Sequence, residues 1–183
     1  MKAKLNKVRL SFPVLWEPKE FKTGDGKPRY SASLVVEKGS ENDKIIEAAI
    51  KAAAAEKFGA KAEKMLKDMR GQKNQFCYRE GDDEQYGDGM LVLACHRKAA
   101  DGRPTILDRN KAPLTSADGK PYAGCYVNAV VEIYAQTGDN PGIRASFSGL
   151  QFAADGEAFG GGRPASADDF DDLGEGADAE DMS

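Results

Sequence analysis

Basic side chains interleaved with aromatic ones are the residues of this 183-residue chain best suited to act on another molecule. They recur near the start of the chain, in the segment that follows, around position 78 and at the end of the apolar stretch near position 96. Single-stranded nucleic acid requires a cationic groove for its phosphates and aromatic faces on which its bases stack. The candidate set for such a surface is Lys7, Arg9, Trp16, Phe21, Lys22, Lys27, Arg29, Tyr30, Tyr78, Arg79, Tyr86, Arg97 and Lys98.

An aromatic residue in a strand belongs more often to the core than to a binding surface. The core interpretation is preferred for Phe12, Phe147 and Phe152. For Tyr30 the two interpretations are balanced, because its position in the alternation matches the apolar face of its strand. Loop or irregular surroundings favour exposure for Trp16, Phe21, Tyr78 and Tyr86.

The residues that could support catalysis do not form a recognisable site. His96 is the single histidine and adjoins Cys95, but no cysteine pair has the spacing of zinc ligands. We therefore expect Cys95 to be a buried thiol and His96 to lie on the outer face. The three glycines at 160–162 are not followed by the Lys-Ser/Thr of a phosphate loop. The sequence predicts no catalytic residue, no metal, no cofactor and no enzyme.

Negative charge collects at the end of the chain. Residues 155–183, the acidic tail, hold ten Asp or Glu and one Arg, a net charge of −9. The whole chain carries −4, so residues 1–154 carry +5. This asymmetry points to a polyanionic partner. The tail has too few large apolar residues to offset the entropy of ordering, so it is predicted to be disordered. A solubilising tail without a partner is the simpler alternative.

Cysteine usage and hydropathy indicate the compartment. Cys77, Cys95 and Cys125 are odd in number and widely spaced, and no secretory leader precedes them. They are predicted to be reduced thiols in a cytoplasm. No apolar run approaches the roughly 20 residues of a membrane span, so no membrane association is expected.

Hydrophobic periodicity predicts the elements that must position the candidate residues. Alternation over 4–15, 29–37, 90–98, 124–136 and 143–152 is typical of five strands with one buried face each. In the first strand, Val8, Leu10, Phe12 and Val14 are expected inside, and Lys7, Arg9, Ser11 and Pro13 outside. Ser40 predicts the start of a helix that ends at Gly59, and a second short helix follows over 62–69. The segment 71–89 is expected to be irregular, and 105–107 could pair briefly.

Alternating strands favour an antiparallel sheet. The predicted fold is therefore mainly β with a helical insertion: an OB-fold-like, five-stranded antiparallel barrel over 1–154, followed by the disordered acidic tail over 155–183. In the standard OB-fold the helix follows the third strand, whereas here the helical segment precedes it. Either the fold is a variant or the strand count is wrong.

The sequence resembles a family of phage-encoded single-stranded DNA-binding proteins with an OB-fold, first catalogued as a domain of unknown function. The resemblance is carried by KVRLSFPVLWEP (7–18), GKPRYSASLVVEK (26–38), GCYVNAVVEIYAQ (124–136) and GIRASFSGLQF (142–152), together with the acidic tail. It implies sequence-independent binding of single-stranded DNA during phage replication or recombination. Many single-strand binders end in acids capped by an aromatic residue, whereas this chain ends in Asp181-Met182-Ser183.

The sequence is compatible with two functions from different classes. The first is single-stranded DNA binding by the barrel, with a tail that competes with DNA and recruits replication or recombination proteins through Phe170 or Leu173. The second is an interaction or inhibitory module whose acidic tail mimics nucleic acid. The sequence leaves open whether the chain forms a homodimer.

Overall fold

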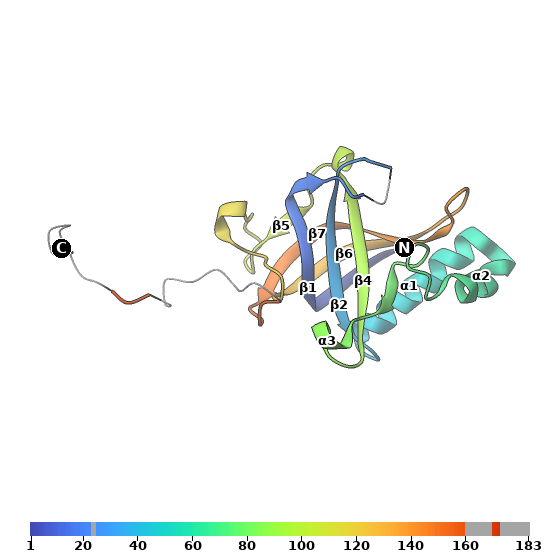
Figure 1. Cartoon of the computed structure of the whole chain (residues 1–183), viewed down its shortest axis with the longest axis horizontal. Coiled ribbons are helices and arrows are strands. Elements are labelled where there is room, and N and C mark those ends of the chain that lie inside the picture. The colour runs from blue at the N-terminus through green and yellow to red at the C-terminus, as the bar shows by residue number, and fades with distance from the viewer. Residues whose placement is uncertain (23–24, 160–169, 173–183) are drawn as a thin grey trace.

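The computed structural model describes residues 1–22, 25–159 and 170–172, and within them a closed β-barrel dominates (Figure 1). One sheet has the order β3-β4-β2-β1-β6-β7-β5. Its strands are β1 (Lys2–Lys19), β2 (Arg29–Glu37), β3 (Tyr78–Glu80), β4 (Met90–Lys98), β5 (Thr105–Leu107), β6 (Tyr126–Gln136) and β7 (Gly142–Ala154). An additional pairing of β4 with β7 joins the two sides of the sheet. The five long strands β1, β2, β4, β7 and β6 thus form a ring, which confirms the predicted five-stranded barrel.

The strand directions agree with the predicted antiparallel sheet, except where β4 and β7 close the barrel. The long pairings β1–β2, β2–β4, β1–β6 and β6–β7 are all antiparallel. The closing pair, His96 of β4 with Ser146 of β7, is parallel. Residues 105–107 do pair, in parallel with β7. The segment expected to be irregular contains β3, which extends the sheet at the free edge of β4.

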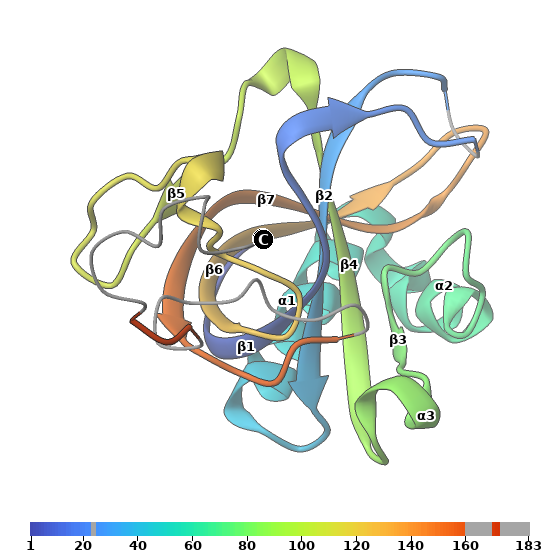
Figure 2. The same cartoon turned by 60° about the vertical axis from the view of Figure 1, so that its left-hand side comes forward.

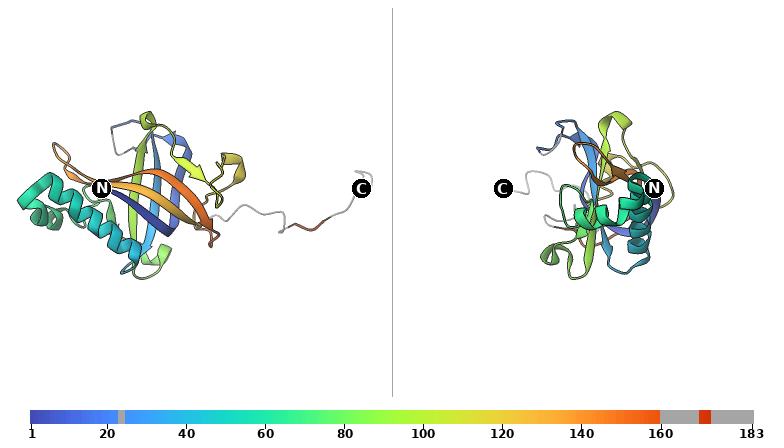
Figure 3. Two further views of the ribbon diagram at one scale, coloured as in Figure 1. Left: turned by 180° about the vertical axis from the view of Figure 1, so that it is seen from behind. Right: turned by 90° about the vertical axis from the view of Figure 1, so that its right-hand side faces the viewer.

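Helices lie between the second and third barrel strands. They are α1 (Glu41–Phe58) and α2 (Ala62–Met69), joined by a 3₁₀ turn (Gly59–Lys61). The Ser40 hydroxyl caps α1 by accepting a hydrogen bond from the Asp43 N–H at 3.3 Å. Ile46, Ile50 and Ala53 are buried on α1, which packs against β1, β2 and β6. Figures 1 and 3 show α1 and α2 together on one side of the barrel, with β5 on the other. The barrel is therefore the variant in which the helix precedes the third strand.

Short helical turns complete the connections. The four-residue α3 (Asp83–Tyr86) begins at Asp82, whose side chain accepts hydrogen bonds from the next turn, and it connects β3 to β4. Further 3₁₀ turns span Ala99–Asp101 and Ser116–Asp118. In the part of the chain that the structure describes, no helix is long and apolar enough to cross a membrane.

The first strand curves around the barrel, so that its first half pairs with β6 and its second half with β2 (Figure 2). Three irregularities in register accompany this curvature, between Leu5 and Val8, between Ser11 and Val14, and between Val14 and Lys19. Lys7 and Phe12 lie in the first two and have positive φ angles of 51° and 45°. At each of these two, β1 contains one residue more than its partner strand, which is a β-bulge that shifts the alternation by one residue. The bulge after Ser11 turns Phe12 outward (64% exposed), so the assignment of Phe12 to the core was wrong. Ser11 keeps the predicted outward orientation but is buried (1% exposed), because its hydroxyl is hydrogen-bonded to Tyr86.

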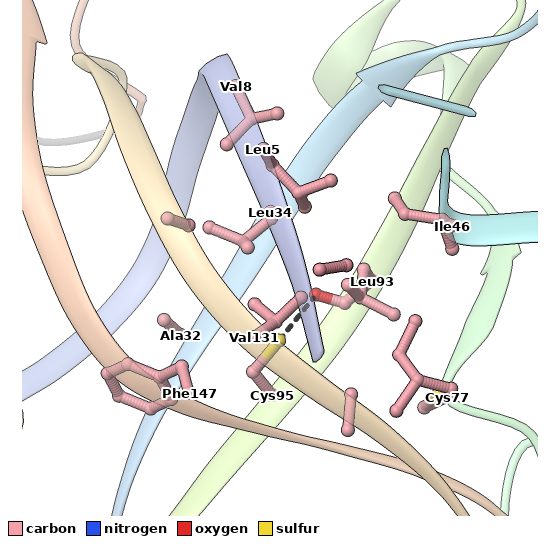
Figure 4. Packing of buried hydrophobic residues seen from close by; sticks show 14 of the residues in the cluster. Leu5, Val8, Ala32, Leu34, Ile46, Cys77, Leu93, Cys95, Val131 and Phe147 are labelled. Carbon is pink, nitrogen blue, oxygen red and sulfur yellow. Dashed lines mark hydrogen bonds between the residues drawn. The ribbon is translucent and has the colours of Figure 1, made fainter. Parts of the chain in front are cut away.

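The barrel interior is filled by side chains from every long strand and from α1. Figure 4 shows Leu34, Leu93 and Phe147 around Cys95, whose thiol contacts the Leu93 carbonyl oxygen at 3.9 Å. Phe147 and Phe152 are buried, as predicted. Burial raises the pKa of the Cys77 thiol to about 12 and that of the Cys125 thiol to about 11. Cys95 points into the core and His96 to the outside, so the two side chains lie on opposite faces of β4.

The packed structure continues past the predicted boundary at residue 154. Residues 155–159, here called the strap, fold back against the barrel. The Tyr122 hydroxyl donates to the Asp155 carboxylate at 2.6 Å, and the Phe159 N–H donates to the Ala123 carbonyl oxygen at 3.2 Å. The predicted disorder of residues 160–169 and 173–183 lies outside the described residues. Phe170 is 70% exposed, and Leu173, the other predicted docking residue, is not described.

Candidate nucleic-acid interface

The outward-facing residues of β1, β2 and β4 form a continuous surface, here called the outer face. Strand register places them in four rows across the three strands. From one end to the other the rows are Arg9–Val35–Val92, Ser11–Ser33–Ala94, Val14–Ser31–His96 and Lys19–Arg29–Lys98. The first and last rows contain the cations, and the middle rows form a floor of small side chains. At about 3.3 Å per residue, the six residue steps from Arg29 to Val35 span about 20 Å.

Aromatic rings lie at both ends of this surface. At one end the Tyr86 hydroxyl shares a hydrogen bond of 2.8 Å with the Ser11 hydroxyl, which holds the α3 ring beside the first two rows. At the other end the Phe21 ring meets the His96 ring edge to face, with 5.8 Å between centroids. The exposed Phe12 ring lines a groove with Arg9, Pro13 and other residues of β1 and α3. A cationic surface with a small floor and aromatic rings is the arrangement that single-stranded nucleic acid requires.

About half of the predicted set is brought together here. Arg9, Arg29 and Lys98 belong to the rows, and Arg79 of β3 pairs with Val92 on the same face. Phe21 and Tyr86 supply the rings described above. Lys22 and Lys27 are exposed in the β1–β2 loop at the Arg29 end. These placements agree with a binding role, which stays a prediction for each residue.

Two predicted stacking residues belong to the core instead. Tyr30 is 7% exposed because it faces the barrel interior from β2. Tyr78 is 3% exposed, and its hydroxyl donates to the Asp43 carboxylate at 2.8 Å, which joins β3 to the start of α1. Burial and that hydrogen bond raise the pKa of the Tyr78 phenol. The expected exposure of Tyr78 was wrong, because Tyr78 belongs to a three-residue strand, where an irregular segment was predicted, and lies opposite the buried Leu93.

Three further candidates lie away from the outer face or are partly covered. The bulge turns Lys7 toward β6, where its backbone N–H donates to the Asn128 side chain at 3.0 Å. Arg97 has the opposite orientation to His96 on β4, and its Nε donates to the Gly102 carbonyl oxygen at 2.8 Å. Trp16 is half-buried against the core, with the Arg103 guanidinium 5.9 Å from its ring centroid. A role of these three residues in binding stays a prediction.

Sequence reasoning missed several residues of this surface. Phe12 was missed because of the bulge, and the serine floor because small polar residues give no signal of their own. Tyr134 of β6 is 42% exposed and pairs with Arg144 of β7 near the β6–β7 hairpin. The parallel pairing of His96 with Ser146, between β4 and β7, brings this hairpin toward His96.

The arginines at the Arg29 end of the outer face shift the pKa values of neighbouring side chains. Partial burial, and then the charges of Arg29 and Arg144, lower the pKa of His96. Arg29 also forms an ion pair of 3.0 Å with Asp25. A hydrogen bond from the Lys27 backbone N–H and the Arg29 charge lower the pKa of the Asp25 carboxyl. With its pKa below the ordinary value, His96 is mainly neutral at pH 7.

The strap covers the Arg9 end of the outer face. The Arg9 guanidinium lies over the Phe159 ring, 4.0 Å from the centroid, and donates to the carbonyl oxygens of Glu157 and Gly124. The Phe159 ring also meets the Tyr86 ring edge to face at 5.2 Å. The packing is close at Gly124, where an added Cβ would meet the Glu157 carbonyl oxygen at 2.2 Å.

Metal chemistry finds no support in this geometry. Within residues 1–22, 25–159 and 170–172, no group of three or more His, Cys, Asp or Glu side chains could hold a metal ion.

A closed five-stranded barrel with cations and aromatic rings along one face defines a protein of the OB-fold-like, single-strand-binding class.

Comparison with known proteins specifies the family. Residues 1–183 match the family model described as "Enterobacter phage Enc34, ssDNA-binding protein". The chain belongs to this family of phage single-stranded DNA-binding proteins. It is 46% identical, over 178 residues and 94% of each chain, to "Putative protein p50" of Acyrthosiphon pisum secondary endosymbiont phage 1.

Solved structures agree with this assignment. The single-stranded DNA-binding protein of bacteriophage Enc34 in complex with ssDNA has a TM-score of 0.69 at 24% identity, covering 87% of this chain and 89% of that chain. A second structure of the Enc34 protein has a TM-score of 0.67 at 26% identity and covers 93% and 90%. The fold is also similar to gp2.5, a single-stranded DNA-binding protein encoded by bacteriophage T7, with a TM-score of 0.57, 10% identity and coverage of 84% and 91%.

Proposed function

We propose that this chain is a non-enzymatic protein that binds single-stranded DNA without sequence preference, in phage DNA replication or recombination within the host cytoplasm. The observation that carries the proposal is the outer face, where cations at both ends flank two middle rows made mostly of small side chains. Membership of the family and the ssDNA complex of the Enc34 protein support it.

The mechanism follows from the rows of the outer face. Arg9 and Arg79 at one end, and Lys19, Arg29 and Lys98 at the other, attract phosphates over a length of about 20 Å. The small floor lets the backbone and bases approach the strands closely, and Phe12, Phe21 and Tyr86 offer faces for stacking. Stacking does not distinguish one base from another, because every base has a π-face, and this accounts for the lack of sequence preference.

In this proposal the acidic tail competes with DNA for the cationic face. The body carries +5 and the tail −9 on the same chain. Tethering keeps the tail at an effective concentration of about 1 mM near the body. When DNA displaces it, the segment around Phe170 is available to replication or recombination proteins.

Fluorescence anisotropy with single-stranded, duplex and RNA probes at two salt concentrations tests the proposal. We expect single strands to be preferred, and log affinity to fall by about 0.7 per log unit of salt for each phosphate neutralised. Lys98→Gln should reduce this slope, whereas Lys64→Gln on α2, which changes the net charge equally, should leave it unchanged. Equal affinity for duplex, or binding that ignores salt, would contradict the proposal and favour the interaction module that mimics nucleic acid.

A further inference from the structure

Arg9 and Tyr86 form two walls of a site that is already assembled by the barrel. The Arg9 Nε donates to the Gly124 carbonyl oxygen at 3.0 Å, and the Tyr86 hydroxyl is bonded to Ser11 at 2.8 Å. Both partners belong to the body of the protein and not to the strap. The guanidinium and the phenol ring are therefore each held by at least one contact that does not involve the strap.

The occupant of this site is a piece of the chain itself. Phe159 places its ring face under the guanidinium at 4.0 Å and contacts the Tyr86 ring at 5.2 Å. Two residues earlier, the Glu157 carbonyl oxygen accepts a hydrogen bond from the same guanidinium. The strap thus presents a flat ring, Phe159, and a hydrogen-bond acceptor, the Glu157 carbonyl oxygen, to the Arg9 guanidinium.

A nucleotide offers the same two groups. A base presents a flat π-face to an arginine plane, and a phosphate oxygen accepts a hydrogen bond from an arginine N–H. We infer that the Arg9–Tyr86 site is a nucleobase-binding subsite, and that Phe159 and the Glu157 carbonyl group fill it as a stand-in for one nucleotide in the free protein. This inference rests on the proposed function and assigns one base to a specific place on the outer face.

The surroundings of the site agree with this inference. Phe12 and Pro13 line the same groove beside Arg9, so a strand whose base enters the subsite continues along an apolar wall. The Arg9–Tyr86 walls contact the ring without a hydrogen bond that reads its edge, which suits any of the four bases. Filling by a base requires the strap to leave, and this releases the guanidinium N–H that Glu157 now occupies.

The full-length chain provides charge-neutral variants for the test. Phe159→Ala removes the ring, and Phe170→Ala is the matched control, because it removes an exposed ring from the same tail. Gly156→Ala retains every ring and charge but displaces the strap, since the added Cβ would meet the Gly124 carbonyl oxygen at 2.2 Å. Arg9→Lys keeps the positive charge and loses the flat stacking surface.

The probes are a short oligothymidylate and an abasic oligonucleotide of equal length, titrated at one salt concentration. We expect Phe159→Ala and Gly156→Ala to bind oligothymidylate more tightly and Phe170→Ala to bind it like the unmodified chain. A base–aromatic stack corresponds to a change of about 5- to 150-fold in affinity, and the gain should fall within this range. The gain should be absent on the abasic probe and in the combination of Phe159→Ala with Arg9→Lys.

The outcomes separate the subsite from the proposed function. An equal gain on both probes would overturn the subsite and show that Phe159 only anchors the acidic tail. Unchanged or weaker oligothymidylate binding by both strap variants would also overturn it, while leaving single-strand binding intact. If neither the unmodified chain nor any variant bound oligothymidylate, the proposed function would fail together with the subsite.

Discussion

Phe12 combines a positive φ of 45° with a side chain that is 64% exposed. A left-handed backbone at a residue with a Cβ costs about 1–2 kcal/mol. Such strain concentrates at functional sites, where the surrounding structure maintains it. The position is therefore better explained by what the ring does at the surface than by what it adds to the fold.

Replacing Phe12 should separate binding from stability. Phe12→Ala should weaken single-stranded DNA binding by about 1–3 kcal/mol if a base stacks on the ring. Phe12→Gly should weaken binding equally and yet unfold at the same or a higher temperature, because glycine adopts positive φ without strain. Anisotropy and thermal unfolding measured on both variants check this. A large loss of stability in both would show that the ring supports the fold.

The bulge that exposes Phe12 could have been predicted from the sequence. Leu10 and Leu15 are both large and apolar, and both lie inside the barrel. They are an odd number of residues apart, so a regular strand would direct one of them outward. The same parity conflict between Leu5 and Val8 marks the first bulge. The serine floor could not be predicted, because its role depends on which strands lie side by side.

His96 should produce a measurable pH dependence because it is the single histidine of the chain. Its pKa is lowered in the folded protein, so the unfolded state binds more protons between the folded pKa and the ordinary value of 6.5. The free energy of unfolding therefore decreases as pH falls through this range. Denaturant unfolding at pH 7 and pH 5 should show this decrease, and His96→Gln should reduce it. An identical decrease in the variant would assign it to the carboxyl groups instead.

At the scale of elements, β3 and α1 are held together by Tyr78. Its ring is buried and its hydroxyl reaches Asp43 in the first turn of the helix. Arg70, after α2, continues this contact through a two-pronged ion pair with Glu47 at 2.9 and 3.0 Å. These bonds connect the helical insertion to the edge of the sheet.

Tyr78 should therefore behave as a structural residue. Tyr78→Ala is expected to cost about 3–5 kcal/mol of unfolding free energy, as for other buried aromatic rings. Tyr78→Phe, which removes the one hydrogen bond, should cost about 0.5–1.5 kcal/mol. Urea unfolding gives both values, and DNA affinity of the folded Tyr78→Phe variant should be unchanged. A selective loss of DNA binding in that variant would restore Tyr78 to the interface.

Most elements could be predicted because the barrel strands are long and half-buried. The bounds of β2 and β4 agree with the predicted 29–37 and 90–98, where alternation is undisturbed. A three-residue strand such as β3 has too few positions for a period to be recognised, so Tyr78 was misplaced with it. The strap was missed because its contacts depend on Tyr122, Ala123 and Gly124, more than thirty residues earlier in the chain.

At the scale of the whole molecule, charge on the tail and contacts of the strap are separable. Ending the chain after Phe159 keeps the strap and removes eight acids and one arginine, a charge of −7. Ending it after Ala154 removes the strap as well. The barrel core is unaffected by either change, because its buried residues end with Phe152.

Removing only residues 160–183 should tighten DNA binding at low salt. A tail at about 1 mM effective concentration that binds the face with a dissociation constant near 0.1 mM would weaken DNA binding about tenfold. Salt screens exposed charges, so the gain should shrink at high salt. Side-by-side titration of the intact and shortened chains measures it. Weaker binding by the shortened, folded chain would show that the tail assists the interface.

The course of β1 around the barrel has a consequence for the order of folding. Its second half pairs with β2 across a short loop, whereas its first half pairs Lys2 with Glu132, a separation of 130 residues. Contacts so distant along the chain form slowly, because loop closure must precede them. The β1–β2 part of the outer face is thus assembled from pairs that are near in sequence, and the barrel that makes it rigid closes last. A chain released before β7 exists would present the cations of β1 and β2 without a firm groove beneath them.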